Sequence, residues 1–299
     1  MLSVERVLEN TRLMRSLTGM DKAEFDVLLA SFANSLFVSF KNKKRLREVG
    51  GGRKGILREV NHKLFFILFY LKVYPTYDLA GFIFNADKSR ISRWVVQFLP
   101  LLEEALGHQA VLPKRKISSL EEFLNLWPEV KDVFIDGTER QTQRPKSQKL
   151  SRKRYSGKKR RHTRKNTIVA TEGRKILMVS PTKEGRVHDL TQLNKTGIIP
   201  NLPQKVTVWA DKGYQGLQKQ VNNTVMAPGK KPKGKPLPLE QKRENKIISG
   251  LRIVVEHAIN GIKRFGSMSA IYRNRKGQDD QMIGICAGLW NLHLQIASK

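Results

Sequence analysis

The chain of 299 residues has a single cysteine, Cys286, and only 26 acidic side chains. One thiol excludes both an intrachain disulfide framework and a zinc site built from cysteines. Long apolar runs are also missing, since no stretch approaches about 18 apolar residues without a charge. The first ten residues, MLSVERVLEN, lack the apolar core of a signal peptide. The sequence therefore predicts a soluble, intracellular protein with no membrane partner.

Against the few acids stand 56 Lys and Arg, which leaves a net charge of +30. An imbalance of this size is typical of a protein whose partner is a polyanion, and nucleic acid is the usual one. Hydrophobic residues still make up 39% of the chain, which is enough to bury a core. We therefore expect the positive charge to lie on folded structure.

The charge divides the chain unevenly. Residues 1–108 hold 17 basic and 11 acidic side chains, whereas residues 109–299 hold 39 and 15. A stretch rich in Gly, Lys and Arg lies between about residues 41 and 58 and has the composition of a linker. We predict an all-α domain over 1–108 and an α/β domain over 109–299, and we expect the second to be the main binder of polyanions.

The N-terminal region ends in three predicted helices, over 62–73, over 77–84 and from Asp87 onward. Asp87 can cap the last helix, which is apolar on one side and basic on the other. The basic side carries Lys88, Arg90 and Arg93. Three short helices of which the last is basic form a helix-turn-helix pattern, whose last helix enters the major groove of DNA. A small helical bundle with a solvated basic face fits the same pattern.

From residue 131 the pattern changes to short apolar runs bounded by turn residues. Five strands are predicted, over 133–139, 166–172, 175–180, 205–211 and 223–228. The first three can form an antiparallel meander, and the last two can add in parallel through right-handed crossovers. Helices are predicted over 188–196, 214–220 and 239–265. We expect the apolar segment 281–297 to form a helix that packs beneath this mixed sheet.

Three acidic residues of the basic C-terminal region each border an apolar run. Asp136 and Asp211 end the first and fourth predicted strands, and Glu256 lies on the predicted long helix. Taken singly, each acid is more typical of a helix cap or an ion pair. Central strands bring their ends together, however, and three converging carboxylates suit hard divalent cations such as Mg²⁺ or Mn²⁺. Two such ions about 4 Å apart support in-line phosphoryl transfer, so the pattern predicts chemistry at a phosphodiester.

The strongest charge run covers residues 140–165, which contain 13 Lys or Arg and no acid. It joins the strand of Asp136 to the next strand, so it would project beside the carboxylates and contact DNA phosphates. Its densest part comprises Lys158, Lys159, Arg160 and Arg161. A basic face that contacts only solvent is the alternative.

The C-terminal region contains the segments VFIDGTER, GRVHDLT, VWADKGYQG and LRIVVEHAINGIKRF. Their combination resembles the catalytic domain of DDE transposases, in the bacterial insertion-sequence group called family five and its Harbinger-like relatives. The similarity covers roughly residues 60–295. It implies a ribonuclease-H-like fold, which agrees with the strand order derived above.

The resemblance places the family's catalytic and metal-binding residues on Asp136, Asp211 and Glu256. The spacings are 75 residues (211 − 136) and 45 residues (256 − 211). It implies that this triad holds two Mg²⁺ or Mn²⁺ ions, with no small-molecule cofactor.

Around the glutamate, the family's helix carries a tyrosine, an arginine and a lysine. Arg252 and Lys263 match the last two and would contact DNA, although both are also compatible with exposed helix charges. Ser249 occupies the tyrosine position. The DNA contact of that tyrosine is therefore expected to differ here.

Three more residues are auxiliary candidates. His188 and Asp189 resemble the family's His-Asp block. We expect Asp189 to cap the following helix, whereas a role of His188 as metal ligand or proton carrier is the less favoured alternative for that residue. Tyr214, three residues after Asp211, could contact DNA near the cleavage point or pack in the core.

The resemblance implies a DNA transposase of the bacterial cytoplasm, associated with the nucleoid. Such an enzyme binds the terminal inverted repeats of its insertion sequence, cleaves the phosphodiester at the element ends and joins the 3′-hydroxyl to target DNA. A homodimer on paired ends is expected, because two ends need two active sites. A regulatory DNA-binding protein without catalysis and a metal-dependent nuclease without strand transfer are the alternatives.

Overall fold

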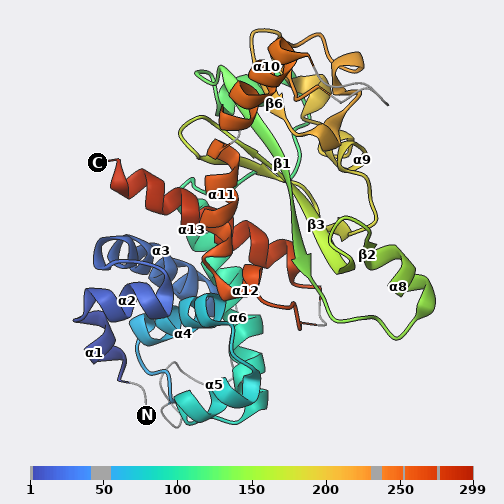
Figure 1. Cartoon of the computed structure of the whole chain (residues 1–299). Coiled ribbons are helices and arrows are strands. Elements are labelled where there is room, and N and C mark those ends of the chain that lie inside the picture. The colour runs from blue at the N-terminus through green and yellow to red at the C-terminus, as the bar shows by residue number, and fades with distance from the viewer. Residues whose placement is uncertain (1–2, 42–54, 230–237, 252, 275–276, 299) are drawn as a thin grey trace. The chain divides into compact units, whose positions relative to one another are not determined.

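The computed structural model of the chain describes residues 3–41, 55–229, 238–251, 253–274 and 277–298 (Figure 1). These residues fall into two compact units. The first unit comprises the described residues of 1–112, 263–270 and 275–299, and the second those of 113–262 and 271–274.

The first unit is all α-helical. Its helices are α1 (Val4–Leu8), α2 (Thr11–Thr18), α3 (Lys22–Lys41), α4 (Val60–Val73), α5 (Tyr77–Phe84), α6 (Lys88–His108), α12 (Gly266–Ser269) and α13 (Asp279–Ala297). An aromatic cluster forms part of the core, where the ring of Phe66 lies 5.1 Å from that of Phe84 and 5.2 Å from that of Trp94. Helix α3 is long and apolar enough to cross a membrane, but its residues Phe25 and Phe32 are buried in this core.

The predicted succession of three helices is present as α4, α5 and α6. Asp87 is the N-cap of α6 as expected, since its Oδ1 accepts a hydrogen bond of 2.9 Å from the backbone N–H of Arg90. The turn between α5 and α6 is tight, because a Cβ on Gly81 would lie 2.4 Å from the carbonyl oxygen of Ala86. Only glycine fits there, so the angle between the two helices depends on Gly81.

The C-terminal helix α13 belongs to the first unit, where it packs against α6 and α3. The expectation that it lies beneath the sheet was wrong, and the second unit is correspondingly shorter than the predicted domain 109–299. Asn291 donates a hydrogen bond of 2.9 Å to the carbonyl oxygen of Val111, and Gln281 donates one of 2.7 Å to Glu103. The helix is apolar around most of its circumference. Such a pattern predicts that a helix is buried, but it does not predict against which elements the helix packs.

The second unit is a mixed sheet with helices. Its strands are β1 (Asp132–Gln141), β2 (Tyr155–Ser156), β3 (Arg161–Ala170), β4 (Ile176–Val179), β5 (Lys183–Glu184), β6 (Thr207–Ala210) and β7 (Val225–Met226). Its helices are α7 (Leu120–Leu126), α8 (Gln148–Arg154), α9 (Asp189–Asn194), α10 (Leu239–Leu251) and α11 (Ile253–Lys263), the last residue of which is grouped with the first unit. Short 3₁₀ turns cover Ile199–Asn201 (η1), Lys212–Tyr214 (η2) and Leu217–Lys219 (η3).

The sheet order is β2-β3-β1-β6-β7, and β4 and β5 also pair with β3. The pairs β1–β3 and β3–β4 are antiparallel, whereas β1–β6 and β6–β7 are parallel. This is the predicted arrangement of a meander extended by two parallel strands. The short elements α8, β2 and β5 were not predicted, because two-residue strands and a basic seven-residue helix carry no apolar period.

Candidate active site

Asp136 and Asp211 lie beside each other on neighbouring strands, Asp136 within β1 and Asp211 directly after β6. In the parallel pair β1–β6, Ile135 is opposite Ala210, and each aspartate is the next residue of its chain. Each carboxylate accepts a hydrogen bond of 2.7 Å from the following backbone N–H, from Gly137 in one case and from Lys212 in the other. Both side chains remain partly exposed. The predicted proximity of the two aspartates is therefore present, although β1 does not end at Asp136 but continues to Gln141. We call Asp136 and Asp211, which follow the last paired residues of β1 and β6, the strand-end pair.

A third carboxylate, that of Asp189, lies between these two strand ends. A Cβ on Gly137 would be 3.1 Å from Oδ1 of Asp189, and one on Gly213 would be 2.6 Å from its Oδ2. Neither glycine has a positive φ, so space rather than backbone conformation requires glycine there. Asp189 thus contacts the residue after Asp136 and the turn after Asp211 at once.

Asp189 is not the helix cap that the sequence suggested. His188 is the N-cap residue of α9, makes no side-chain cap hydrogen bond and is exposed, while Asp189 is the first helical residue. Its carboxylate instead forms an ion pair with Lys165, whose Nζ lies 3.0 Å from Oδ1.

Lys165 is buried and holds several groups in place. Its Nζ lies 3.5 Å from Oε1 of Glu139 and donates a hydrogen bond of 3.1 Å to the carbonyl oxygen of Val187. Removing one partner of a buried ion pair is costly because it leaves an uncompensated charge. The sequence had assigned Lys165 to the DNA-binding charge run. The sequence carries no signal for its burial, because the neighbours at two residues on either side, Thr163 and Thr167, are polar as well, although both are buried.

Tyr214 is 1% exposed and belongs to the core of the second unit. Of the two predicted roles, packing is therefore correct and contact with DNA is wrong. Burial raises the pKa of Tyr214 well above its ordinary value of 10.0, and the carboxylates of Asp189, Asp136 and Asp211 raise it further. The phenol lies close enough to all three aspartates to be affected by their charge.

This raised pKa predicts an alkaline loss of stability. Above pH 10 an unfolded chain releases the phenol proton while the folded chain keeps it, so the free energy of unfolding falls as pH rises. The slope is at most about 1.4 kcal/mol per pH unit and ends at the folded pKa. Urea unfolding of wild type and Tyr214→Phe between pH 8 and 11 measures it. The variant should show a shallower decline, and equal slopes would contradict the assignment.

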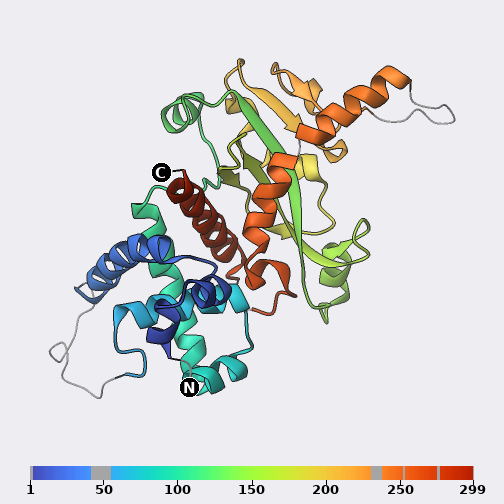
Figure 2. The same ribbon diagram turned by 60° about the vertical axis from the view of Figure 1, so that its left-hand side comes forward.

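Glu256 lies on α11, which runs alongside β1 in both views of the ribbon (Figures 1 and 2). Its side chain is exposed. Within the described ranges, no three His, Cys, Asp or Glu side chains lie close enough together to hold one metal ion. The convergence of Glu256 with the two aspartates is therefore not formed in this structure and stays a prediction.

The remaining candidate residues of α10 and α11 differ in how exposed their side chains are. The buried side of α11 includes Val255 and Ile259, whereas Ile253 is 47% exposed. Ser249 is exposed and Lys263 is half-buried. Arg252 lies outside the described residues.

The basic candidates lie on exposed surfaces. Lys158, Lys159, Arg160 and Arg161 are exposed at the turn between β2 and β3. The turn is held by a hydrogen bond of 3.3 Å from the N–H of Lys159 to Ser156 and by one of 2.9 Å from Arg161 to Gln141. Its cations are thus presented on a defined backbone, as contact with phosphates requires.

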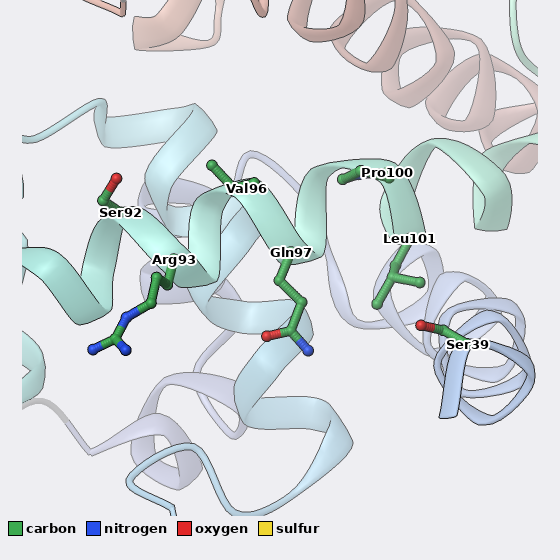
Figure 3. Close-up of a pocket in the computed structure, with 7 residues that line it drawn as sticks. All are labelled: Ser39, Ser92, Arg93, Val96, Gln97, Pro100 and Leu101. Atoms are coloured by element: carbon green, nitrogen blue, oxygen red, sulfur yellow. The ribbon is translucent and has the colours of Figure 1, made fainter. Parts of the chain in front are cut away.

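The N-terminal half of α6 is also basic and exposed. Lys88, Arg90 and Arg93 all have exposed side chains. Figure 3 shows Arg93 and Gln97 projecting from the same side of α6, where they line a pocket of about 420 Å³ together with Ser39 of α3. Arg93 also lines a hollow of about 1110 Å³ with Arg58. This face has the charge and the donors that a DNA groove needs.

Comparison with known families decides between the interpretations. A family model described as DDE superfamily endonuclease matches residues 135–291, which is more than half of the chain. The chain belongs to this family. A second model, the helix-turn-helix of DDE superfamily endonuclease, matches residues 57–108, so α4 to α6 of this endonuclease are a helix-turn-helix rather than a featureless bundle. The mixed sheet fits the ribonuclease-H-like fold of DDE endonucleases, which are metal-dependent enzymes.

A curated relative is similar over almost the whole chain. The "Probable transposase for insertion sequence element IS702" of Microchaete diplosiphon is 28% identical over 296 residues, which is 99% of each protein. No solved structure matches the endonuclease.

Proposed function

We propose that this DDE endonuclease is the transposase of an insertion sequence. It binds the terminal inverted repeats of its element, cleaves the phosphodiester at the element ends and joins the freed 3′-hydroxyl to target DNA. The observation that carries the proposal is the pair Asp136 and Asp211, which follow the last paired residues of the parallel strands β1 and β6, in an enzyme that also has a helix-turn-helix. The name of the full-length relative supports the same function.

The residues at the strand ends fit divalent cations. Asp136 and Asp211 offer hard oxygen ligands, are partly exposed and lie in a strongly basic chain, and Glu256 on α11 would complete the set. When bound, Mg²⁺ or Mn²⁺ activates the attacking oxygen and stabilises the leaving one. Asp189, held by Lys165, keeps the two strand ends at a fixed separation. The turn of Lys158 to Arg161 neutralises phosphates of the bound DNA.

Two copies of the enzyme act together in this proposal, one for each element end. Cleavage and joining take place on chromosomal DNA in the bacterial cytoplasm. The freed 3′-hydroxyl needs no covalent protein intermediate, because the same pair of aspartates serves hydrolysis and joining.

Strand transfer separates a transposase from a nuclease. The assay supplies a duplex of the element end with its 3′-hydroxyl already exposed, a supercoiled plasmid as target, and Mg²⁺ or Mn²⁺. We expect covalent joining of the duplex to the plasmid. Cleavage of intact ends without any joining would support the nuclease and contradict the proposal.

The helix-turn-helix face gives a second expected result. Arg93→Ala should weaken binding to the terminal repeat and reduce the slope of log K against log salt by about 1, since one phosphate contact is lost. Arg12→Ala, which removes an exposed arginine of α2 outside the helix-turn-helix, is the charge-matched control. Fluorescence anisotropy at several salt concentrations measures both. Equal slopes for the two variants would place the DNA elsewhere.

A further inference from the structure

The basic excursion between β1 and β3 contains a pocket away from the catalytic aspartates. Its volume is about 680 Å³, large enough for a nucleotide. Its lining consists of Arg144, Ser151, Arg152, Tyr155, Gly157, His162 and Arg186. Three guanidinium groups and no carboxylate line it among the described residues. The pocket therefore suits an anion.

The pocket also contains an aromatic side chain on which a base could stack. Tyr155, the first residue of β2, is 45% exposed. Its ring packs edge-on against His162, with 5.7 Å between the ring centres. His162 is itself oriented by Ser151, whose Oγ lies 2.8 Å from Nε2. The tyrosine ring is thus supported from one side and open on another.

An open aromatic face beside several arginines is a combination that binds nucleotides. A base stacks on the ring, and the guanidinium groups pair with the adjoining phosphates. We propose that this pocket binds one nucleotide of the substrate DNA, its base on Tyr155 and its phosphates on Arg144, Arg152 and Arg186.

The sheet sets the distance from this pocket to the cleavage site. Asp136 is opposite Ile168 on β3, and six residues along the same strand His162 is opposite Tyr155. Six strand residues span about 20 Å, which equals about six base pairs of B-form DNA. Figure 1 shows β2 and α8 at the far end of β1 from β6. If the DNA runs along β3, the bound nucleotide is about six positions from the scissile phosphate.

The proposal rests on the proposed function, because it takes the substrate to be the element end. Duplexes of that end carry a single 5-iodouracil at each position from three to ten nucleotides from the cut. After irradiation, the crosslinked peptide is identified by mass spectrometry. We expect the strongest crosslink near position six, on the peptide that contains Tyr155.

Four variants test the contact. Tyr155→Ala should lose that crosslink and bind the element end about tenfold more weakly, whereas Tyr155→Phe, which keeps the ring, should bind like wild type. Arg186→Ala should weaken binding, and Arg174→Ala, an exposed arginine at the other end of β3, should not. Circular dichroism confirms that each variant is folded.

The outcomes separate the two proposals. If wild type cuts and binds the element end but Tyr155→Ala binds equally well and crosslinks elsewhere, the pocket assignment is wrong and the proposed function stands. If wild type does not bind the element end at all, both are wrong.

Discussion

Asp136→Asn and Asp211→Asn should each lower metal-dependent DNA cleavage by at least about 10³-fold. Each removes a charged oxygen ligand from the strand-end pair, and such ligands stabilise the transition state by several kcal/mol through the metal they hold. DNA binding should be unchanged or stronger, since a negative charge beside the phosphates is lost. Gel-based cleavage and anisotropy with the same labelled duplex measure the two effects separately.

Asp132→Asn is the matched control for this prediction. Asp132 is the first residue of the same strand, β1, and its Oδ1 accepts a hydrogen bond of 2.7 Å from Nε1 of Trp209. Asparagine can accept the same bond, so cleavage should stay within a few-fold of wild type. If Asp132→Asn and Asp136→Asn lose cleavage to the same extent, the strand-end pair is not the site of metal binding.

The second large effect is expected from Gly213→Ala, which should lower cleavage by about 10²-fold. The new Cβ would lie 2.6 Å from Oδ2 of Asp189, so either that carboxylate or the turn that carries Asp211 must shift. A displacement of about 1 Å in a catalytic group costs this much. The Mn²⁺ concentration for half-maximal cleavage should rise in parallel, because the ligand is misplaced rather than removed.

A double-mutant cycle tests that physical cause. Asp189→Ala removes the group with which the new methyl collides, so adding Gly213→Ala to it should cost little more. Gly173→Ala, in the turn between β3 and β4, serves as the control, since its Cβ would have 3.8 Å to the nearest atom. Additive losses of Asp189→Ala and Gly213→Ala would show that Asp189 does not set the spacing of the strand ends.

The sequence contains most of what positions the aspartate pair. Helices α4 to α6 could be predicted because their apolar residues and the cap residue Asp87 agree on the same boundaries. The strand order could be predicted because short apolar runs alternate with turns, and crossover rules leave few arrangements. Asp136 and Asp211 followed from their position after apolar strands in a chain with few acids.

What could not be predicted depends on tertiary neighbours. Lys165 has the same sequence surroundings as the exposed lysines of its charge run, and only the packing of α9 on β3 shows that it is buried. The role of Asp189 depends on two glycines, Gly137 and Gly213, that are distant in sequence from it. The packing partners of α13 were not predicted, because a helix that is apolar on most sides can pack in any core.

The central claim is that Asp136 and Asp211 form the catalytic centre of a transposase acting on its own element ends. The most direct test is cleavage of an end-labelled duplex with the gene's flanking DNA, in Mg²⁺ or Mn²⁺, by wild type and by Asp211→Ala. The account predicts metal-dependent cuts at the boundary of the inverted repeat that disappear in the variant. Binding of this duplex by wild type without a cut in either metal, or cuts that persist in Asp211→Ala, would contradict it.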